Sequence, residues 1–162
     1  VKDVSKAITK EKILTKLILM NNSIKSDFGI TNPKIAVLGL NPHSGDNGLI
    51  GNEEHSIIEP TIVEANKKGV VSYGPFPSDG FFANELYKKY DGVLAMYHDQ
   101  GLIPFKVISK NEGVNFTAGL PIIRTSPDHG TGYDIGGLGI ANSNSFKNSI
   151  LMAKIIYEKR LK

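Results

Sequence analysis

Short apolar runs that alternate with segments of helical periodicity constrain the fold of this chain more than any other feature. The runs predict strands over 34–40, 70–73 and 92–97. The segments between and before them predict helices over 9–27, 53–68 and 80–90. Such alternation is typical of a parallel sheet, because each parallel pair needs a crossover that is usually a helix. The sequence therefore predicts an α/β fold with a largely parallel sheet.

Local signals refine the helices. Gly29 is placed to stop the first helix, Gly69 ends the second, and Pro60 marks a kink or an interruption within the second. Ser145 is expected to cap a final helix. The apolar residues expected to share one face of that helix are Phe146, Ile150, Ala153 and Tyr157.

The regular alternation of predicted strands and helices ends near residue 100. After Pro104 come three short strand-like pieces, FKVI (105–108), VNFTAG (114–119) and PIIRTS (121–126), and then the glycine-rich stretch DHGTGYDIGGLGIAN (128–142). This change suggests a boundary between two lobes, 1–100 and 101–162.

The composition excludes several classes of protein. The chain has 162 residues, of which 40% are hydrophobic and 22% charged, and it contains no cysteine. These values are typical of a soluble globular protein, and no apolar run approaches the roughly 20 residues of a membrane-spanning helix. The lack of cysteine rules out disulfides and thiolate metal sites. No signal peptide is recognisable, so the cytoplasm is the expected location.

The net charge of +3 is mild, and the lysines are scattered rather than gathered in a basic run. A nucleic-acid partner is therefore not expected, whereas a small anionic substrate fits the charge equally well.

Two histidines follow two of the expected strands directly. His43 comes after the strand 34–40, and His98 comes after the strand 92–97. Because the carboxyl ends of parallel strands meet at one edge of a sheet, both imidazoles are expected there. They either bind a metal ion or merely cap loops and hydrogen-bond to carbonyl groups. Asp99, Asp79 or a residue outside the chain would complete a metal site, whereas His55 reads as solvated surface.

Three further polar residues lie in or after the apolar pieces that follow His98: Lys106, Asn115 and Arg124. Arginine binds phosphate or carboxylate with two parallel hydrogen bonds, and lysine acts as a point charge. The group suits an anionic ligand, although an edge-strand lysine and a structural salt bridge explain it as well. The loop NPHSGDNGLIG (41–51) matches no known phosphate-binding motif and is a weak nucleotide signal.

The glycine-rich stretch resembles the segment that wraps the adenosine of NAD or NADP in isocitrate and isopropylmalate dehydrogenases. The motifs GLNPHSGDNGLIGNEE, GPFPSDGFF, VLAMYHDQGLIPFK and GVNFTAGLPIIRTSPDHGT narrow the likeness. Together they resemble the family of 4-hydroxythreonine-4-phosphate dehydrogenases of vitamin B6 biosynthesis, most strongly from Asn32 to Ser149. This resemblance implies the α/β/α sandwich of the isocitrate/isopropylmalate dehydrogenase-like fold.

The resemblance also assigns roles to residues of this chain. It implies that His43 and His98 bind a divalent cation (Zn, Co, Mn or Mg), with Asp79 and Asp99 close to substrate and metal. It makes Lys106, Asn115 and Arg124 contacts of a small phosphorylated substrate. The residues implied on the NAD or NADP side are His129, Gly130, Thr131 and Asp134.

The reaction implied is metal-assisted oxidation of 4-phosphohydroxy-L-threonine, followed by decarboxylation to 3-amino-2-oxopropyl phosphate. Family members are about twice as long as this chain, which resembles their C-terminal half, and a third metal histidine is expected upstream of Val1. The family also implies a homodimer whose active site is shared between subunits. Three alternatives stay open: a sister dehydrogenase of erythronate or threonate 4-phosphate, a phosphate acyltransferase, and a non-catalytic metal-binding or dimerisation module.

Overall fold

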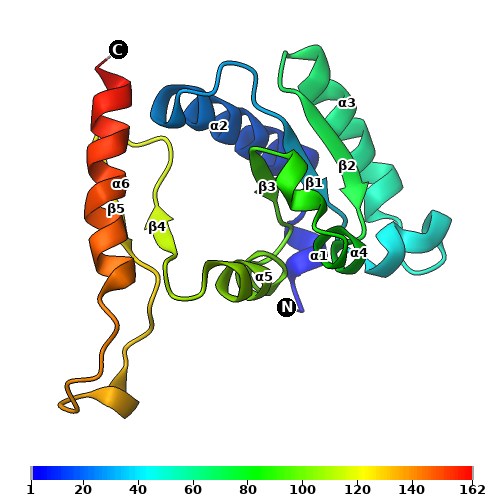
Figure 1. The fold of residues 1–162 in the computed structure, drawn as a ribbon. Helices are drawn as coiled ribbons and strands as arrows, with labels where there is room; N and C mark the ends of the chain where they lie inside the picture. The colour runs from blue at the N-terminus through cyan, green and yellow to red at the C-terminus, as the bar shows by residue number, and fades with distance from the viewer. Residues whose placement is uncertain (1, 162) are drawn as a thin grey trace.

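A computed structural model describes residues 2–161 and is drawn in Figure 1. The helices are α1 (Val4–Ala7), α2 (Lys10–Phe28), α3 (Glu59–Lys67), α4 (Ser78–Ala83), α5 (His98–Ser109) and α6 (Asn144–Arg160). The strands are β1 (Ile35–Leu38), β2 (Ser72–Phe76), β3 (Gly92–Leu94), β4 (Val114–Phe116) and β5 (Thr125–Pro127). Short helical turns cover Pro42–Gly48, Glu54–Ile58, Leu86–Lys89 and Tyr133–Ile135. Within residues 2–161 no helix has the length and apolar character needed to cross a membrane.

The main sheet has the strand order β2-β1-β3, and both pairs are parallel. All four residues of the central strand β1 are buried, as expected for a parallel strand that is covered on both faces. Ile35 and Val37 belong to the larger core cluster, whereas Ala36 and Leu38 belong to a second cluster with Phe81 of α4. The predicted α/β fold with a parallel sheet is confirmed.

Helices α2 and α3 cover the face of the sheet that Ile35 and Val37 form (Figure 1). Thr9 caps α2 by accepting a hydrogen bond from the Lys12 amide, and Gly29 ends it in the left-handed conformation that glycine adopts without strain. The predicted helix 9–27 is therefore confirmed with its stop signal. The interruption expected at Pro60 is a π-helical turn, Glu54–Ile58, that runs into α3.

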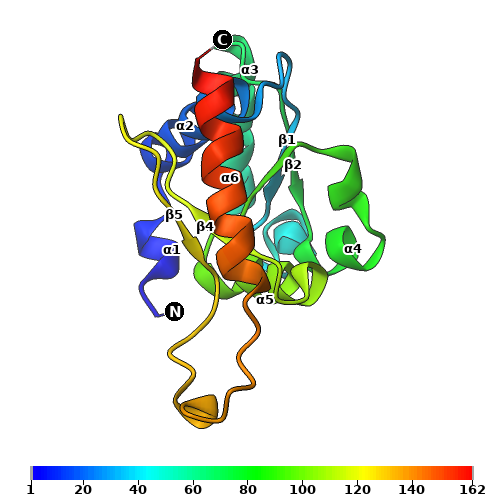
Figure 2. The ribbon, with the colours of Figure 1, turned by 60° about the vertical axis from the view of Figure 1, so that its left-hand side comes forward.

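A second unit of structure follows α5. Strands β4 and β5 form an antiparallel pair, and α6 packs against both of them (Figure 2). The segment between β5 and α6 extends beyond the end of α6 as a long loop (Figures 1 and 2). At its other end α6 contacts α2, where Arg160 Nε lies 2.6 Å from the buried Asp27 carboxylate.

The prediction of a strand at FKVI was wrong, because these residues lie inside α5. A short apolar run reads equally well as a buried strand and as one face of a helix. Pro104 was a misleading boundary signal: it sits within α5, where its ring removes one backbone donor without ending the helix. The expected helix 80–90 is split into α4 and a 3₁₀ turn, and the strand expected over 92–97 ends at Leu94.

Ser145 does not cap α6. The N-cap residue is Ser143, which makes no side-chain capping bond, and Ser145 is buried in the first turn. The predicted apolar face also points away from the packed side, since Phe146, Ile150 and Tyr157 are exposed. The buried positions of α6 are Ser145, Ser149 and Ile156. Helical periodicity identifies a face but not the direction in which it points.

Candidate active site at the sheet edge

The carboxyl ends of the three parallel strands carry four of the predicted site residues. His43 lies in the turn after β1, Asp79 in the first turn of α4 after β2, and His98 and Asp99 at the start of α5 after β3. The turn that holds His43 contacts α4 directly. The expectation that these residues share one edge of the sheet follows from the parallel topology, and this is the edge at which α/β folds bind ligands.

The turn that carries His43 has an unusual backbone. Residues 43–47 all have positive φ, from 44° at Asp46 to 82° at Gly45. A non-glycine residue in the left-handed region costs about 1 kcal/mol or more, and a run of such residues is rare. The surrounding contacts must hold this conformation in place.

Glu54 provides the central contact of this turn. Its side chain is buried, and its carboxylate accepts a hydrogen bond from the Asn41 amide at 2.7 Å and from Asn41 Nδ2 at 2.9 Å. Asn41 Nδ2 also donates to Glu53 at 2.8 Å, and this bond lowers the pKa of the half-buried Glu53 carboxyl group. A second tie joins the turn to β2, because Ser44 Oγ donates to the Pro75 carbonyl oxygen at 3.3 Å.

The first three residues of α5 differ in exposure: His98 and Asp99 are exposed, and Gln100 is buried. His98 Nδ1 lies 2.8 Å from the Asp99 carboxylate, and both side chains are exposed. Gln100 is buried; its Nε2 donates to the Gly39 carbonyl oxygen at 2.6 Å and its Oε1 accepts from the Met96 amide at 2.7 Å. Gln100 thus joins the segment after β3 to the end of β1. Of the three polar residues that follow the strand, only His98 and Asp99 remain available to a ligand.

Two cavities flank α5. One, of about 580 Å³, is lined by both Asp79 and Asp99, together with Gln100 and apolar residues of α5. The other, of about 710 Å³, is lined by His98 and Tyr97 and by mainly apolar side chains. Both volumes lie within the range of small-molecule sites. His43 lines neither of them, so the structure gathers Asp79 with Asp99 but does not place the two histidines in one cavity.

The donors at this edge fit a divalent cation as part of a ligand set. With the Asp99 carboxylate at His98 Nδ1, the tautomer that donates from Nδ1 presents Nε2 to a metal, which is the usual carboxylate–histidine arrangement. Across residues 2–161 no three His, Asp or Glu side chains are grouped so as to hold an ion. His43 and His98 therefore suit a metal chemically, but a complete site needs a further ligand.

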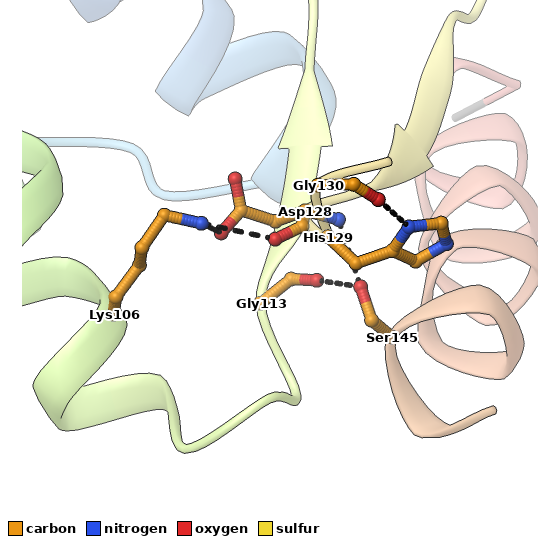
Figure 3. A network of polar contacts seen from close by, with 6 residues as sticks. All are labelled: Lys106, Gly113, Asp128, His129, Gly130 and Ser145. Carbon is orange, nitrogen blue, oxygen red and sulfur yellow. Dashed lines mark hydrogen bonds and ion pairs between the residues drawn. The ribbon is translucent and has the colours of Figure 1, made fainter. Parts of the chain in front are cut away.

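A second group of polar residues lies between α5 and the β4–β5 pair (Figure 3). Lys106 Nζ, which is on α5 rather than on an edge strand, lies 2.9 Å from the Asp128 carboxylate and 3.1 Å from its carbonyl oxygen. The Asp128 amide donates to Ser145 Oγ at 2.8 Å, and Ser145 Oγ donates to the Gly113 carbonyl oxygen at 2.6 Å. These bonds fix the end of β5, the start of β4 and the first turn of α6 to one another.

Of the other two predicted substrate contacts, Asn115 lies on β4 and Arg124 directly precedes β5. Asn115 pairs with Ser126 across the two strands, and Arg124 Nη1 donates to Thr117 Oγ1 at 3.0 Å. The backbone pairing continues one step past β4, because the Thr117 amide donates to the Arg124 carbonyl oxygen at 3.1 Å. Both Asn115 and Arg124 are exposed.

All four residues predicted on the cofactor side line one cavity of about 670 Å³ within the glycine-rich segment: His129, Gly130, Thr131 and Asp134. The His129 ring Nδ1 lies 2.9 Å from the Gly130 carbonyl oxygen (Figure 3). Asp128 and Ser145 line the same cavity, so the network around Lys106 reaches its wall.

Sequence reasoning missed Glu54, Gln100 and Asp128, which help to hold this site together, and it assigned a fourth such residue, Ser145, a different role as a helix cap. Each acts through a partner distant in the chain, such as Gly39 for Gln100 and Lys106 for Asp128. No periodicity or spacing marks such partners. The buried state of Glu54 is equally hidden, because Glu53 beside it is chemically identical and half-exposed.

Comparisons with known proteins agree over nearly the whole chain. Residues 1–153 match the family described as pyridoxal phosphate biosynthetic protein PdxA. A 4-hydroxythreonine-4-phosphate dehydrogenase from Bacteroides thetaiotaomicron is 51% identical over 99% of this chain and 44% of its own length. The crystal structure of 4-hydroxythreonine-4-phosphate dehydrogenase from Klebsiella pneumoniae has a TM-score of 0.82 at 41% identity, over 96% of this chain and 47% of that one.

A third similar protein has another name. The structure of a terephthalate 1,2-cis-dihydrodioldehydrogenase from Burkholderia xenovorans LB400 has a TM-score of 0.73 at 27% identity, over 94% of this chain and 48% of that one. The chain thus spans about half the length of each of these relatives. Because the family match covers almost all of its residues, the chain belongs to the pyridoxal phosphate biosynthetic protein PdxA family.

Proposed function

We propose that the protein to which this chain belongs oxidises 4-phosphohydroxy-L-threonine with NAD or NADP. The product, 2-amino-3-oxo-4-phosphooxybutanoate, is a β-keto acid that loses carbon dioxide to give 3-amino-2-oxopropyl phosphate. The observation that carries this proposal is that His43, Asp79, His98 and Asp99 follow the carboxyl ends of three parallel strands in a member of this family. The names of its relatives support the same reaction.

His43 and His98 are proposed as metal ligands. A divalent cation bound there would act as a Lewis acid on the hydroxyl group that is oxidised. Asp99 orients the His98 ring through its bond to Nδ1, and Asp79 and Asp99 share a cavity in which a carboxylate can take up the proton that the substrate releases. Imidazole ligands suit zinc and cobalt, whereas manganese and magnesium prefer oxygen ligands.

Lys106, Asn115 and Arg124 are proposed to hold the anionic groups of the substrate. Two are cations and the third is an amide donor, the chemistry that a phosphate or carboxylate requires. Lys106 currently pairs with Asp128, so its ammonium group would exchange part of this contact for a substrate oxygen. The proposed cofactor site is the cavity formed by His129, Gly130, Thr131 and Asp134, whose 670 Å³ suits one half of a dinucleotide.

The proposed assembly is a homodimer in which each active site takes residues from both subunits. Two observations support it: the exposed state of His98, and the need for a ligand beyond the two histidines. Within each subunit we propose that residues 1–100 belong to a metal-binding and dimerisation lobe and 101–162 to a substrate and cofactor lobe. The cytoplasm is the proposed location, as for an enzyme that draws on the soluble NAD pool.

The second candidate is dehydrogenation of D-erythronate or D-threonate 4-phosphate. This reaction needs the same contacts to a phosphate and a hydroxyl group. One of the similar structures is named as a dehydrogenase of a terephthalate dihydrodiol, which supports the view that relatives of this fold differ in substrate. The catalytic efficiency of the purified full-length protein should be measured on all three phosphates with NAD⁺ and NADP⁺, before and after treatment with a chelator. We expect the hydroxythreonine phosphate to be preferred and activity to return when metal is added back. Preference for a sugar-acid phosphate would reject this substrate, and turnover unaffected by chelation would reject the metal.

A further inference from the structure

The left-handed turn at residues 43–47 holds His43 in a backbone conformation that its own sequence does not favour. Four of its five residues have side chains, and only Gly45 adopts positive φ without strain. The hydrogen bonds inside the loop are few and long, such as Ser44 N to the Asn41 carbonyl oxygen at 3.2 Å and Ile50 N to the Gly45 carbonyl oxygen at 3.2 Å. Contacts from outside the turn must therefore select this conformation.

The buried side chain of Glu54 packs against the turn and the residues before it. Its carboxylate binds both the backbone and the side chain of Asn41, two residues before His43. Glu54 also fills the space beside two glycines: a methyl group added at Gly45 would lie 2.8 Å from Glu54 Oε2, and one added at Gly39 would lie 3.0 Å from Oε1. Gly39, which follows β1, Asn41 and Gly45 in the turn thus all lie against the Glu54 carboxylate.

Glu53 offers a matched comparison within the same chain. It also accepts a hydrogen bond from Asn41 Nδ2, but the Asn41 backbone amide donates to Glu54 and not to Glu53, and the Glu53 side chain is only half-buried. Replacing its carboxylate with an amide leaves an oxygen that still accepts this bond. The same change at Glu54 places an NH₂ group where it must face either the Asn41 amide or Asn41 Nδ2, both of which are donors.

We propose that Glu54 is a positioning residue that holds the turn of His43 in its metal-binding conformation and thereby sets the affinity for the divalent cation. This inference rests on the proposed function in one respect, the role of His43 as a ligand. Groups that orient a metal ligand typically contribute 10–100-fold to metal affinity. A purely structural glutamate would change stability and would leave the affinity of the folded protein for metal unchanged.

The test uses the full-length protein stripped of metal by a chelator. The dissociation constant of Zn²⁺ is measured by competition calorimetry for wild type, His43→Ala, Glu54→Gln and the control Glu53→Gln. We expect His43→Ala to lose Zn²⁺ binding, Glu54→Gln to bind it about 10–100-fold more weakly, and Glu53→Gln to remain within about threefold of wild type. The dissociation constant of NAD⁺, whose proposed cavity is elsewhere, should be unchanged in every variant.

Hydrogen exchange supplies a second readout that does not depend on metal. In Glu54→Gln the backbone amides of Asn41 and of residues 43–51 should exchange faster, while the Gly39 amide, which donates to the Phe76 carbonyl oxygen in the sheet, should keep its rate. If Glu54→Gln does not fold, Asn41→Ala removes the side-chain half of the same contact and should also weaken Zn²⁺ binding at least tenfold.

Two results would overturn the inference, and they are distinguishable. If His43→Ala loses Zn²⁺ but Glu54→Gln (or Asn41→Ala in its place) binds it like Glu53→Gln, the positioning role is wrong and the proposed function survives. If His43→Ala binds Zn²⁺ like wild type, the proposed metal role of His43 fails, and the effect assigned to Glu54 fails with it.

Discussion

Asp99 and Gln100, which are neighbours at the start of α5, differ in role. Asp99 is exposed and pairs with His98, whereas Gln100 is buried and satisfies two backbone groups, the Gly39 carbonyl and the Met96 amide. The sequence explains both only as polar residues at a strand end. It cannot separate them, because the partner of Gln100 lies 61 residues away in the chain.

Substitution of Gln100 should therefore affect stability, and substitution of Asp99 should affect catalysis. Gln100→Leu leaves the buried Gly39 carbonyl and the half-buried Met96 amide unpaired and should lower the free energy of unfolding by about 2 kcal/mol. Asp99→Asn should leave that free energy within about 0.5 kcal/mol of wild type, since the side chain is exposed, but should lower kcat. Urea denaturation and steady-state kinetics measure the two effects. A Gln100→Leu protein as stable as wild type would contradict the structural role.

Arg124 is the residue whose chemistry is most specific among the proposed substrate contacts. Arg124→Lys keeps the positive charge but loses the planar fork, so the KM for the phosphorylated substrate should rise about tenfold while NAD⁺ affinity stays constant. Lys154→Arg, on the exposed side of α6, is the control and should change neither value. An unchanged KM in Arg124→Lys would remove this residue from the substrate site.

Among the elements, α2 and α6 are joined by an ion pair between the buried Asp27 carboxylate and the half-buried Arg160 guanidinium group. Burial raises the pKa of Asp27, but hydrogen bonds from Arg160, Ser23 and Ser26 outweigh it and the pKa is lowered overall. A carboxyl group with a lowered folded-state pKa stabilises the protein above its unfolded pKa, about 3.9, and this stabilisation is lost as the pH falls through the folded value.

Asp27→Asn should therefore lower the free energy of unfolding at pH 7 by about 2 kcal/mol, and the difference from wild type should shrink below about pH 4. Glu158→Gln breaks an exposed pair on the same helix and should change stability by less than about 0.5 kcal/mol. Urea denaturation at several pH values measures both. A difference between Asp27→Asn and wild type that persists undiminished at pH 2 would show that the pair is not the cause.

Elements with strong local signals were predictable and those set by distant contacts were not. The helix 9–27 has a cap, a periodic face and a glycine stop, and it appears almost unchanged as α2. The run FKVI has no such signals, and a short apolar run does not distinguish a strand from one face of a helix such as α5. The apolar face of α6 was identified correctly as a face, but the serines on its other side pack inward because Ser145 bonds to the backbone of the β4–β5 pair.

For the whole molecule, the sequence predicted which side chains share one edge of the sheet, but not the contacts that support them. Strand-end positions were enough to predict that His43 and His98 lie at one sheet edge, because parallel topology requires it. The left-handed turn at residues 43–47, the burial of Glu54 and the hydrogen bond from Gln100 to Gly39 depend on contacts between separate segments. These contacts leave no pattern in the sequence. The proposed dimer would add contacts between two chains, because each site would be completed by residues of the second subunit.

The central claim is that His43 and His98 serve a metal-dependent dehydrogenase site completed across the dimer. A mixed-dimer assay tests it most directly. Full-length subunits carrying His43→Ala and His98→Ala are each expected to be inactive alone, while His55→Ala, in an exposed position, should be active. After random mixing, one site in each mixed dimer regains both histidines, so about a quarter of the wild-type activity should return. Activity in either single variant, or no recovery despite demonstrated mixed dimers, would contradict the account.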